Sequence, residues 1–392
     1  MTAGITPRLQ GIHTARDFRA VARRRLPRTV FDFIDGGAEE EMTLRGNEAA
    51  IDGIRFRPKV LTDVAQRDTG SHLFEAKLSA PFAVAPMGGL GVAAANAEVA
   101  IAKACASASI PYTLSMAAGV SIDDLRSAAP AANLWFQLYA LDDEGLNRAI
   151  LARAQAAGYQ ALVITVDTQV IPKRLRDLRN GFALPPPLSL RAVIDALAHP
   201  GWLAKVYFGA GLPGLPVLAA ERPELDDLDT AIRFLGQHRR QGLRPSDLVA
   251  LRGMWRGPLL LKGVSRSDDA MLALECGVDG VILSNHGGRN LDCAAPPMDL
   301  LPEVMDAVTD RLSIMIDGSF WRGGDIIKAL ARGARAVLLG RPFAYAVSAG
   351  GQAGVSHLIS TLTDEISRTM GFLGCTGLHQ LDSSLLQMEV QP

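Results

Sequence analysis

The chain has 392 residues, of which 48% are hydrophobic and 21% are charged, so a sizeable core can form and extensive disorder is excluded. The 40 Lys and Arg residues nearly balance the 41 Asp and Glu residues, and the net charge of −1 offers no electrostatic footprint for nucleic acid. We therefore expect a small-molecule partner and no nucleic acid. The length allows two or three domains, or a single barrel with insertions.

Neither the cysteines nor the N-terminus indicates export. The four cysteines lie far apart and form no C-x-x-C pair, which indicates reduced thiols and favours neither a disulfide framework nor a thiolate metal site. The first residues contain no apolar segment typical of signal peptides, and no run of about 18 apolar residues occurs. We expect a cytoplasmic protein with no membrane span and no bound metal.

In chain order, residues 1–79 come first and are interpreted as a helical cap with an acidic turn at 35–41. Eight short apolar runs follow, each suited to a strand buried on both faces: 81–86, 111–115, 134–139, 161–167, 259–264, 280–285, 313–318 and 336–341. Stretches with helical spacing of Ala and Leu alternate with them at 97–108, 121–129, 144–157, 268–276, 302–310 and 325–331. Gly158, Gly277 and Gly333 stand where helix C-caps would fall.

The alternation of strands and helices predicts a parallel sheet, and no linker separates the fourth run from the fifth. We therefore predict an α/β fold with a single (β/α)8 TIM barrel over residues 80–392, so that residues 1–392 form one domain. Residues 168–258 are too long for one ordinary connection, which indicates an insertion between strands 4 and 5. We interpret it first as a lid or subunit contact. A membrane contact through residues 188–220 is the second interpretation, which would need exposed apolar surface.

Most of the predicted strands end in a polar or charged residue, at the edge where barrel enzymes build active sites. These residues are Gln137, Asp167, Lys262, Asn285, Asp317 and Arg341. Because strand ends also become polar where they merely meet solvent, only specific combinations of residues carry a functional argument.

The strongest combination is the loop 284–290, Ser-Asn-His-Gly-Gly-Arg-Asn, directly after the sixth predicted strand. His286 can exchange a proton near neutral pH, and Arg289 presents a planar fork suited to a carboxylate. The intervening glycines allow a ligand to approach closely. A lone histidine after a strand is more often structural, but the His-Gly-Gly-Arg combination favours catalysis.

Three further charged residues have two interpretations each. Asp167 can cap a turn, or it can orient His286 and stabilise its protonated form. Lys262, on an otherwise apolar strand, can extend to solvent or stabilise a developing anion. Arg174 can belong to a solvated basic loop or supply a second contact to a carboxylate. For Arg174 the sequence pattern alone favours the solvated basic loop, whereas the residue types and their spacing do not decide between the two interpretations of Asp167 and of Lys262.

The last two predicted strands are followed by Asp317-Gly318-Ser319 and by Gly340-Arg341, where barrels often bind phosphate. Backbone amides at helix N-termini favour an anion at such a place. The simplest hypothesis is therefore that these residues bind the phosphate of a phosphorylated cofactor.

Together these residues resemble the FMN-dependent L-2-hydroxy acid oxidase and dehydrogenase family, which includes glycolate oxidase, L-lactate dehydrogenase and (S)-mandelate dehydrogenase. The resemblance covers nearly the whole chain. It begins at 26–27 (Leu-Pro) and 36–39 (Gly-Gly-Ala-Glu), continues through 135–139 (Trp-Phe-Gln-Leu-Tyr) and 165–167 (Thr-Val-Asp), and is strongest at 284–289.

The resemblance implies a role for each matching residue. His286 would be the general base with Asp167 as its partner, and Arg174, Arg289 and Tyr139 would bind the 2-hydroxy acid as two electrons pass to FMN. Lys262 would stabilise the reduced flavin. The residues implied in FMN binding are Pro86, Met87, Gly88, Ser115, Gln137, Thr165, Lys262, Ser284, Asp317, Gly318, Ser319, Trp321, Arg322, Gly340 and Arg341, with the phosphate near the last positions.

Four positions bear on the substrate or depart from the family pattern. Phe33 stands in place of the usual substrate-binding tyrosine, and Trp321 replaces the first arginine of an Arg-Arg pair. Gly88 and Ala117 are small where members of that family carry alanine and tryptophan, which enlarges the space beside the flavin. We therefore expect an aromatic or bulky acid of the mandelate or 4-hydroxymandelate type, with L-lactate as the second candidate.

The resemblance also bears on the electron acceptor, the assembly and the location. The acceptor is O2 or quinone, and a homotetramer is expected by resemblance. The inserted segment is similar to the one through which mandelate and bacterial lactate dehydrogenases touch the membrane, so attachment to the inner face of the cell membrane is a second expectation for location.

Two competing functions are weighed against this one. Type 2 isopentenyl diphosphate isomerase, which has a similar FMN barrel, needs no carboxylate clamp and is disfavoured by the pair Arg174 and Arg289. A non-catalytic FMN-binding role, or a partner-dependent role on a peptide-derived or tethered substrate, is encouraged by Phe33 and Trp321.

Overall fold

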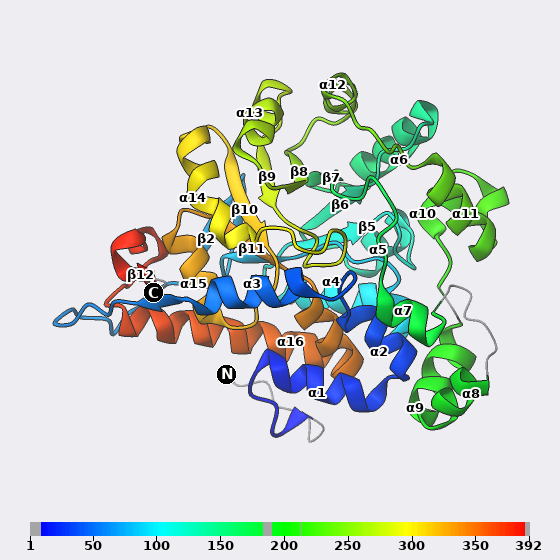
Figure 1. Ribbon diagram of the computed structural model, residues 1–392, viewed down its shortest axis with the longest axis horizontal. Coiled ribbons are helices and arrows are strands. Elements are labelled where there is room, and N and C mark those ends of the chain that lie inside the picture. Colours follow the sequence, from blue (N-terminus) through cyan, green and yellow to red (C-terminus); the bar gives the residue numbers. More distant parts are fainter. Residues whose placement is uncertain (1–8, 183–189, 212, 389–392) are drawn as a thin grey trace.

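Eight parallel strands form a closed barrel in the computed structural model, which describes residues 9–182, 190–211 and 213–388 (Figure 1). The strands are β4 (Phe82–Val84), β5 (Tyr112–Ser115), β6 (Leu134–Leu138), β7 (Ala161–Thr165), β8 (Leu259–Val264), β9 (Gly280–Leu283), β10 (Ser313–Asp317) and β11 (Ala336–Leu339). Their order around the barrel is β10-β11-β4-β5-β6-β7-β8-β9. The predicted (β/α)8 barrel is confirmed, and each predicted run contains one of its strands.

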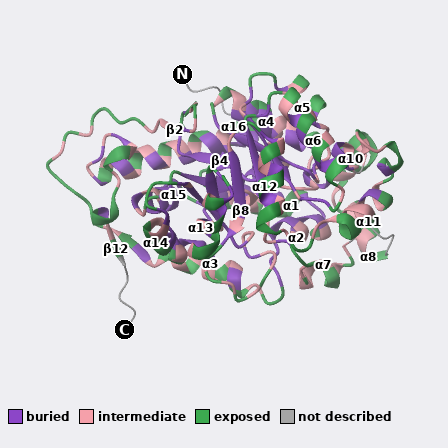
Figure 2. Ribbon diagram, turned by 90° about the horizontal axis from the view of Figure 1, so that it is seen from above, coloured by how far each residue is buried: buried purple, intermediate pink, exposed green. Residues whose placement is uncertain are grey.

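The barrel strands are buried on both faces, as their unbroken apolar runs require (Figure 2). Alternate residues such as Val163, Ile282 and Met315 fill the interior. The hairpin of β2 (Ser71–Leu73) and β3 (Ala76–Leu78) packs its leucines into the same interior cluster, and Phe74 at its turn contacts the ring of Trp135. The hairpin therefore closes the barrel at the end opposite the strand carboxyl ends.

Eight helices accompany the barrel strands. They are α4 (Ala97–Ser107), α5 (Ile122–Ala128), α6 (Glu144–Ala156), α12 (Pro245–Met254), α13 (Ser267–Glu275), α14 (Pro297–Val308), α15 (Gly323–Ala331) and α16 (Arg341–Phe372). Gly158, Gly277 and Gly333 follow α6, α13 and α15 with positive φ angles of 73°, 78° and 100°, as expected of C-cap glycines. The sequence did not predict α12, which lies within 168–258, or α16, whose glycine-rich stretch is broken at Gly351 (φ 58°, ψ −143°).

The N-terminal cap contains α1 (Ala15–Arg25), α2 (Arg28–Asp35) and α3 (Met42–Asp52). Thr14 and Asp17 form a capping box at the start of α1, whose buried face includes Phe18 and packs against α16. After α3, β1 (Ile54–Phe56) pairs antiparallel with β12 (Leu386–Met388). The two ends of the described chain are thus fastened to the same side of the barrel (Figure 1).

The segment between β7 and α12 contains several short helices. They are α7 (Leu175–Asn180), α8 (Leu190–Leu197), α9 (Pro200–Trp202), the π-helix η3 (Leu203–Ala210), α10 (Pro216–Ala219), the 3-10 turn η4 (Pro223–Leu225) and α11 (Leu228–His238). Helix α7 packs on α2, whereas α8 and α9 stand at one end of the molecule (Figure 1). Residues 188, 189 and 212 of the predicted membrane segment lie outside the described residues. No helix in the described ranges has the length and apolarity needed to cross a bilayer.

A buried carboxylate ties α2 to three neighbouring elements. Asp35, which is 4% exposed, accepts hydrogen bonds from Arg19 of α1 (2.5 and 2.8 Å), Arg176 of α7 (2.8 Å) and the Tyr345 hydroxyl of α16 (2.7 Å). Burial opposes ionisation of Asp35, but these donors outweigh it and lower its pKa to about 2. Arg176 also reaches Glu41 (2.5 Å), so the network fixes the start of the insertion to the cap.

Replacing Asp35 with Asn should lower the free energy of unfolding by about 2–4 kcal/mol at pH 7, because two guanidinium groups lose their buried counter-charge. A folded-state pKa of about 2 lies below the usual 3.8, so this stabilisation is present above pH 3.8 and is lost as the pH falls towards 2. Denaturant unfolding at pH 7 and pH 3 measures both effects. Asp229→Asn, which breaks an exposed ion pair with Arg233, is the control; an Asp35→Asn cost no larger than the control's would contradict the assignment.

Candidate active site

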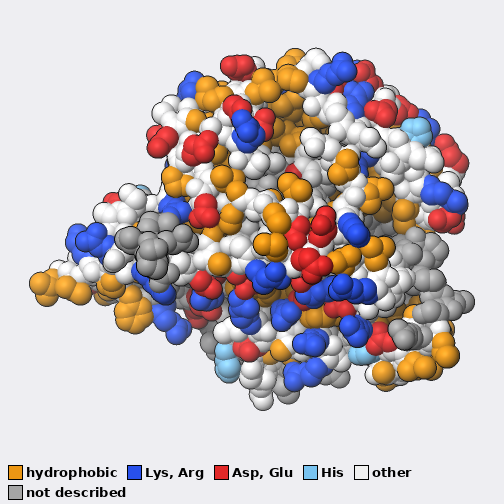
Figure 3. All heavy atoms as spheres, viewed as in Figure 1, with side chains coloured by type: hydrophobic (Ala, Val, Ile, Leu, Met, Phe, Trp, Pro, Cys, Tyr) orange, Lys and Arg blue, Asp and Glu red, His pale blue; other side chains and the backbone are white. Residues whose placement is uncertain are grey.

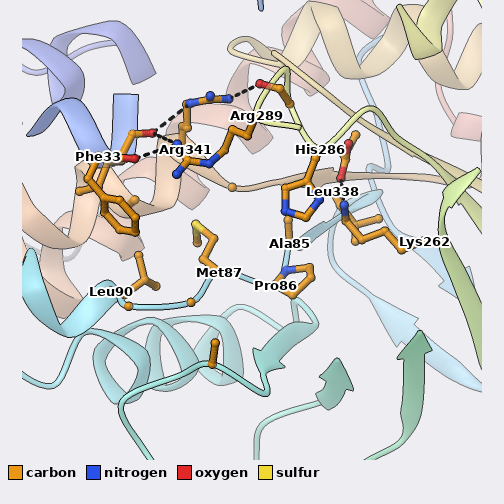
Figure 4. A pocket seen from close by; sticks show the side chains of 18 of the residues that line it. Phe33, Ala85, Pro86, Met87, Leu90, Lys262, His286, Arg289, Leu338 and Arg341 are labelled. Carbon is orange, nitrogen blue, oxygen red and sulfur yellow. Dashed lines mark hydrogen bonds and ion pairs between the residues drawn. The ribbon is translucent and has the colours of Figure 1, made fainter. Parts of the chain in front are cut away.

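A cavity of about 440 Å³ opens at the carboxyl ends of the barrel strands. The cap contributes Phe33 to its lining, and the insertion contributes Arg174 and residues of α11. Figure 4 shows Phe33 of the cap across the cavity from His286 and Lys262 of the barrel. The predicted site residues that line it are Phe33, Pro86, Met87, Gly88, Ala117, Tyr139, Arg174, Lys262, His286, Arg289, Asp317, Gly318, Ser319, Trp321, Gly340 and Arg341. The structure therefore gathers most of the predicted residues at one place.

His286 and Asp167 are in direct contact at this cavity. Nδ1 of His286 lies 3.0 and 3.2 Å from the two carboxylate oxygens of Asp167, which leaves Nε2 as the nitrogen without this partner. A bulge at Gly263 (φ 104°) allows this approach, because a Cβ there would lie 2.6 Å from the Asp167 side chain. His286 itself has a φ of 57°, a rare conformation for a residue with a side chain.

The electrostatics of the pair suit a neutral imidazole next to an ionised carboxylate. Burial lowers the pKa of His286, and Asp167 only partly offsets this. Burial alone would raise the pKa of Asp167, but the charges of His286 and Lys262 bring it below its usual value. His286 can therefore accept a proton at Nε2 at neutral pH, with Asp167 in place to stabilise the imidazolium that results.

Lys262 is held in a second buried ion pair. Its Nζ lies 3.0 Å from a carboxylate oxygen of Asp317 and donates to the Ser284 hydroxyl at 2.9 Å. Burial opposes the charge, but Asp317 and Asp167 raise the pKa of Lys262, so the ammonium persists although its side chain is only 4% exposed. Of the two interpretations, extension to solvent is excluded.

Among the buried polar atoms that have no hydrogen-bond partner within the described part of the chain, four belong to predicted cofactor residues: Gln137 Nε2, Thr165 Oγ1, Asp317 Oδ1 and Ser319 Oγ. Leaving such atoms unpaired costs about 1–3 kcal/mol each, so a polar ligand is expected to satisfy them. They include an amide donor and hydroxyl groups close to the Lys262 ammonium, a set that suits a flavin ring and its ribityl chain. The residues present thus fit FMN. Ser115 and Ser284 are buried with them, and the Ser115 hydroxyl donates to Gln137 at 2.9 Å.

Three arginines at the cavity form no ion pair with a described carboxylate. Arg289 Nη1 donates to the carbonyl oxygens of Phe33 (2.7 Å) and Gly36 (2.9 Å), which leaves Nε and Nη2 without acceptors among the described residues. Arg174 Nε donates over a long 3.4 Å to the carbonyl oxygen of Arg289, and its Nη atoms have no acceptor in the described ranges. Arg341 donates to the carbonyls of Ile34, Gly36 and Gly287 (Figure 4).

These arginines lie close enough to repel one another. Burial lowers the pKa of Arg289 well below its usual range, and the charges of Arg174 and Arg341 lower it further. Burial likewise lowers the pKa of Arg174. The negative charge of Asp177 favours the charged forms of Arg174 and Arg289, but Asp177 forms no ion pair with either arginine among the described residues. The arrangement is an unsatisfied anion site, and a carboxylate bound between Arg174 and Arg289 would relieve it.

Two predicted cofactor residues have other partners. The guanidinium of Arg322 pairs with Asp325 and Asp52 outside the cavity, and its side chain is 54% exposed, so the structure does not bring it to the site. Trp321 does line the cavity, but its ring stacks on Tyr345 and its indole N–H donates to Glu48 at 3.0 Å. The indole is thus held in place by Tyr345 of α16 and Glu48 of the cap. It supplies no positive charge in place of the arginine expected at this position.

Sequence reasoning missed the part of the cavity wall that the insertion supplies. Leu228, Ile232 and Leu235 of α11 line the cavity, and their i, i+4, i+7 spacing was a signal that could have been read. Arg239, which follows α11, lines it too. A basic residue at a helix end is usually solvated, so no signal in the sequence distinguished this arginine.

Comparison with known proteins agrees with the geometry. The family described as FMN-dependent dehydrogenase matches residues 22–388. An L-lactate dehydrogenase of Caulobacter sp. (strain K31) is 41% identical over 381 residues, which span 96% of this chain and 98% of that protein. A putative L-lactate dehydrogenase of Mycobacterium tuberculosis is 38% identical over 378 residues, 95% of this chain and 89% of that protein.

Solved structures show the same fold. The monotopic membrane protein (S)-mandelate dehydrogenase superimposes with a TM-score of 0.93 at 35% identity, covering 97% of this chain and 100% of that chain. A mandelate oxidase superimposes with a TM-score of 0.81 at 31% identity, covering 96% and 98%. Barrel, cavity and relatives together define a flavin enzyme that oxidises 2-hydroxy acids. The chain belongs to the FMN-dependent dehydrogenase family.

Replacing Asp167 with Asn should slow flavin reduction by about 100-fold or more, because the imidazolium formed at His286 loses its counter-charge. Asp167 raises the pKa of His286, so its removal should also move the acidic limb of the pH profile of kcat/KM to lower pH. Stopped-flow flavin reduction between pH 4.5 and 8 measures both. Asp142→Asn, at an exposed residue paired with Arg240, serves as the control. An unchanged acidic limb in Asp167→Asn would show that the carboxylate does not act through His286.

Proposed function

We propose that this protein uses FMN to oxidise a bulky L-2-hydroxy acid, aromatic or long-chain, to the 2-oxo acid. The observation that carries the proposal is the shape of the cavity wall away from the anion site. Gly88 and Ala117 lie against each other there, since a Cβ on Gly88 would stand 2.9 Å from the Cβ of Ala117. Leu228 and Ile232 of α11 extend the same wall with apolar surface. A large apolar side chain on the substrate would bury this surface.

In this proposal the substrate is held by its carboxylate between Arg174 and Arg289, which offer it N–H groups that no described residue accepts. Tyr139, which lines the same cavity, donates a hydrogen bond from its hydroxyl group to the substrate. His286 takes up at Nε2 the proton that the substrate loses, and Asp167 stabilises the imidazolium. Transfer as a hydride or through a carbanion needs the same base in the same place.

FMN would be held along the barrel mouth by the residues that carry unpaired polar atoms. Pro86, Met87 and Gly88 would contact the ring, and Lys262 would stabilise negative charge on it. The backbone at Gly318, Ser319 and Gly340, beside the start of α16, would hold the phosphate. Bound FMN supplies the acceptor for the two electrons that the substrate loses.

Phe33 supports an apolar substrate side chain. Its ring stacks on Phe182 with centroids 4.5 Å apart, and the Arg289 guanidinium lies 5.4 Å from the ring centroid. A phenylalanine here contributes an apolar wall where a tyrosine would add a hydroxyl. The same ring orders the arginine that would bind the carboxylate.

L-lactate is the second candidate substrate. It is favoured by the relatives at 38–41% identity, which are called L-lactate dehydrogenases. A peptide-derived substrate presented by a partner is the third, and the open cavity mouth formed by the insertion would receive it.

Anaerobic titration of the yellow protein with mandelate, 4-hydroxymandelate, lactate and glycolate tests the proposal. We expect the aromatic acids to bleach the flavin with the highest kcat/KM. Ala117→Trp should lower kcat/KM for mandelate by about 100-fold and affect glycolate little, because the indole fills the side-chain space. Glycolate serves as the internal control for intact chemistry. Preference of the unaltered protein for glycolate or lactate would contradict the bulky-substrate proposal.

A separate measurement concerns the electron acceptor. Formation of peroxide in air would indicate O2 as the acceptor, and its absence would favour quinone.

We also propose that the insertion contacts a membrane surface. Leu190, Ile194 and Leu197 of α8 and Phe208 of η3 are exposed, and apolar side chains gather over α8 and α9 (Figure 3). Monotopic attachment requires exposed apolar helices of this kind. Bilayer attachment would also bring the enzyme close to a quinone.

Ile194→Asp together with Phe208→Asp should reduce co-sedimentation with phospholipid vesicles by about tenfold or more, because two apolar side chains no longer enter the interface. Both residues are exposed (59% and 76%), so the variant should fold normally. Val249→Asp on α12, which is 53% exposed and lies outside the membrane segment 188–220, is the matched control. Equal sedimentation of the double variant and the control would refute the contact.

A further inference from the structure

Arg239 places a fourth guanidinium at the substrate cavity, in addition to those of Arg174, Arg289 and Arg341. The residue follows the last turn of α11 and lines the cavity together with Leu235. Its guanidinium carbon lies 5.9 Å from the centre of the Tyr139 ring. Arg239 therefore stands on the side of the cavity formed by the insertion and Tyr139.

The backbone around Arg239 is firmly placed. Residues Leu141 and Arg239 form an antiparallel bridge just beyond the end of β6. The amide of Arg240 donates to the Ala140 carbonyl at 2.8 Å, and the amide of Asp142 donates to the His238 carbonyl at 2.8 Å. These bonds join the end of α11 to the segment that carries Tyr139, so the direction of the Arg239 side chain is set by the fold.

The side chain of Arg239 is charged but unpaired among the residues that the structure describes. Its Nε is buried without a hydrogen-bond partner there, and none of the described carboxylates forms an ion pair with it. Arg240, the next residue, behaves in the opposite way and pairs with Asp247 (2.5 Å) and Asp142 (3.3 Å). Of these two consecutive arginines, Arg240 is neutralised by aspartates, whereas Arg239 faces the cavity with no described counter-ion. Contact with the Tyr139 ring does not replace the lost hydrogen bonds of a buried donor.

We propose that Arg239 is a specificity residue that binds an anionic group at the far end of the substrate. The preferred substrate class is then a 2-hydroxy acid with a second, distal carboxylate, separated from the first by an apolar stem. This inference rests on the proposed function, which places the reacting carboxylate at Arg174 and Arg289. The apolar stem of the substrate lies along Leu228, Ile232 and Leu235. The distal carboxylate accepts hydrogen bonds from the guanidinium of Arg239.

A matched pair of flexible substrates tests this. The (S)-2-hydroxyadipate and (S)-2-hydroxyhexanoate chains have the same length and differ only in a terminal carboxylate or methyl group. We expect kcat/KM for flavin reduction to be about tenfold or more higher with hydroxyadipate. Arg239→Met, which keeps the apolar stem but removes the charge, should reduce that ratio by about 10- to 100-fold, with hydroxyhexanoate changing less than about threefold.

Arg233→Met is the control, because Arg233 lies on α11, the helix that Arg239 follows, but pairs with Asp229 at the surface. It should keep the wild-type ratio. Binding of the products 2-oxoadipate and 2-oxohexanoate, measured by calorimetry, gives a second readout that does not require turnover. Wild-type preference for 2-oxoadipate, lost in Arg239→Met, is the expected result.

The outcomes separate this inference from the proposed function. If neither of these acids nor the aromatic acids reduce the flavin, the proposed function fails, and the calorimetric preference still decides the role of Arg239. If both acids are oxidised with equal kcat/KM, or if Arg239→Met keeps the preference for the dicarboxylates, the distal site is refuted while the oxidation chemistry stands.

Discussion

The arrangement of the active site depends on two guanidinium groups that bind the carbonyl oxygens at the end of α2. Arg289 and Arg341 follow β9 and β11, the two strands on either side of β10, and both donate to the backbone between Phe33 and Gly36. The C-terminal end of a helix carries partial negative charge, so it can orient cations without a carboxylate. Because both guanidinium groups bind backbone carbonyls of the cap, they hold the cap on the barrel mouth. Their positive charge remains available to a bound anion.

Carboxylates near the cavity are assigned to particular cations. Asp167 belongs to His286, and Asp317 belongs to Lys262. Asp35, which would otherwise compete for the arginines at the site, is occupied by Arg19 and Arg176. The nearly neutral chain therefore contains a strongly positive cavity because its acidic groups are held elsewhere by specific ion pairs.

The barrel and the centre of the site could be predicted because each depends on local sequence. Strands buried on both faces produce unbroken apolar runs, and the loop 284–290 carries its glycines, base and arginine together. Helix α16 was not predicted because its glycines resemble a loop, and tertiary packing overrides their low helix propensity. Arg322 and Arg239 show the other limit: whether an arginine faces a cavity or an aspartate depends on residues far away in the chain. Asp52 and Asp325 hold Arg322 outside, whereas no described residue neutralises Arg239.

The two halves of the cavity have different origins in the chain. The imidazole of His286, the unpaired polar atoms of Gln137, Thr165, Asp317 and Ser319, and the ammonium of Lys262 all stand on barrel strands or the loops that directly follow them. The wall that contains Leu228 and Ile232 comes from α11, within a segment that the barrel does not need for closure. Substitutions on that wall can change which molecules fit without disturbing the redox machinery. The fold thus places the α11 wall and the His286–Asp167 pair on separate parts of the chain, so that altering a single connection would change the shape of the cavity while leaving the pair in place.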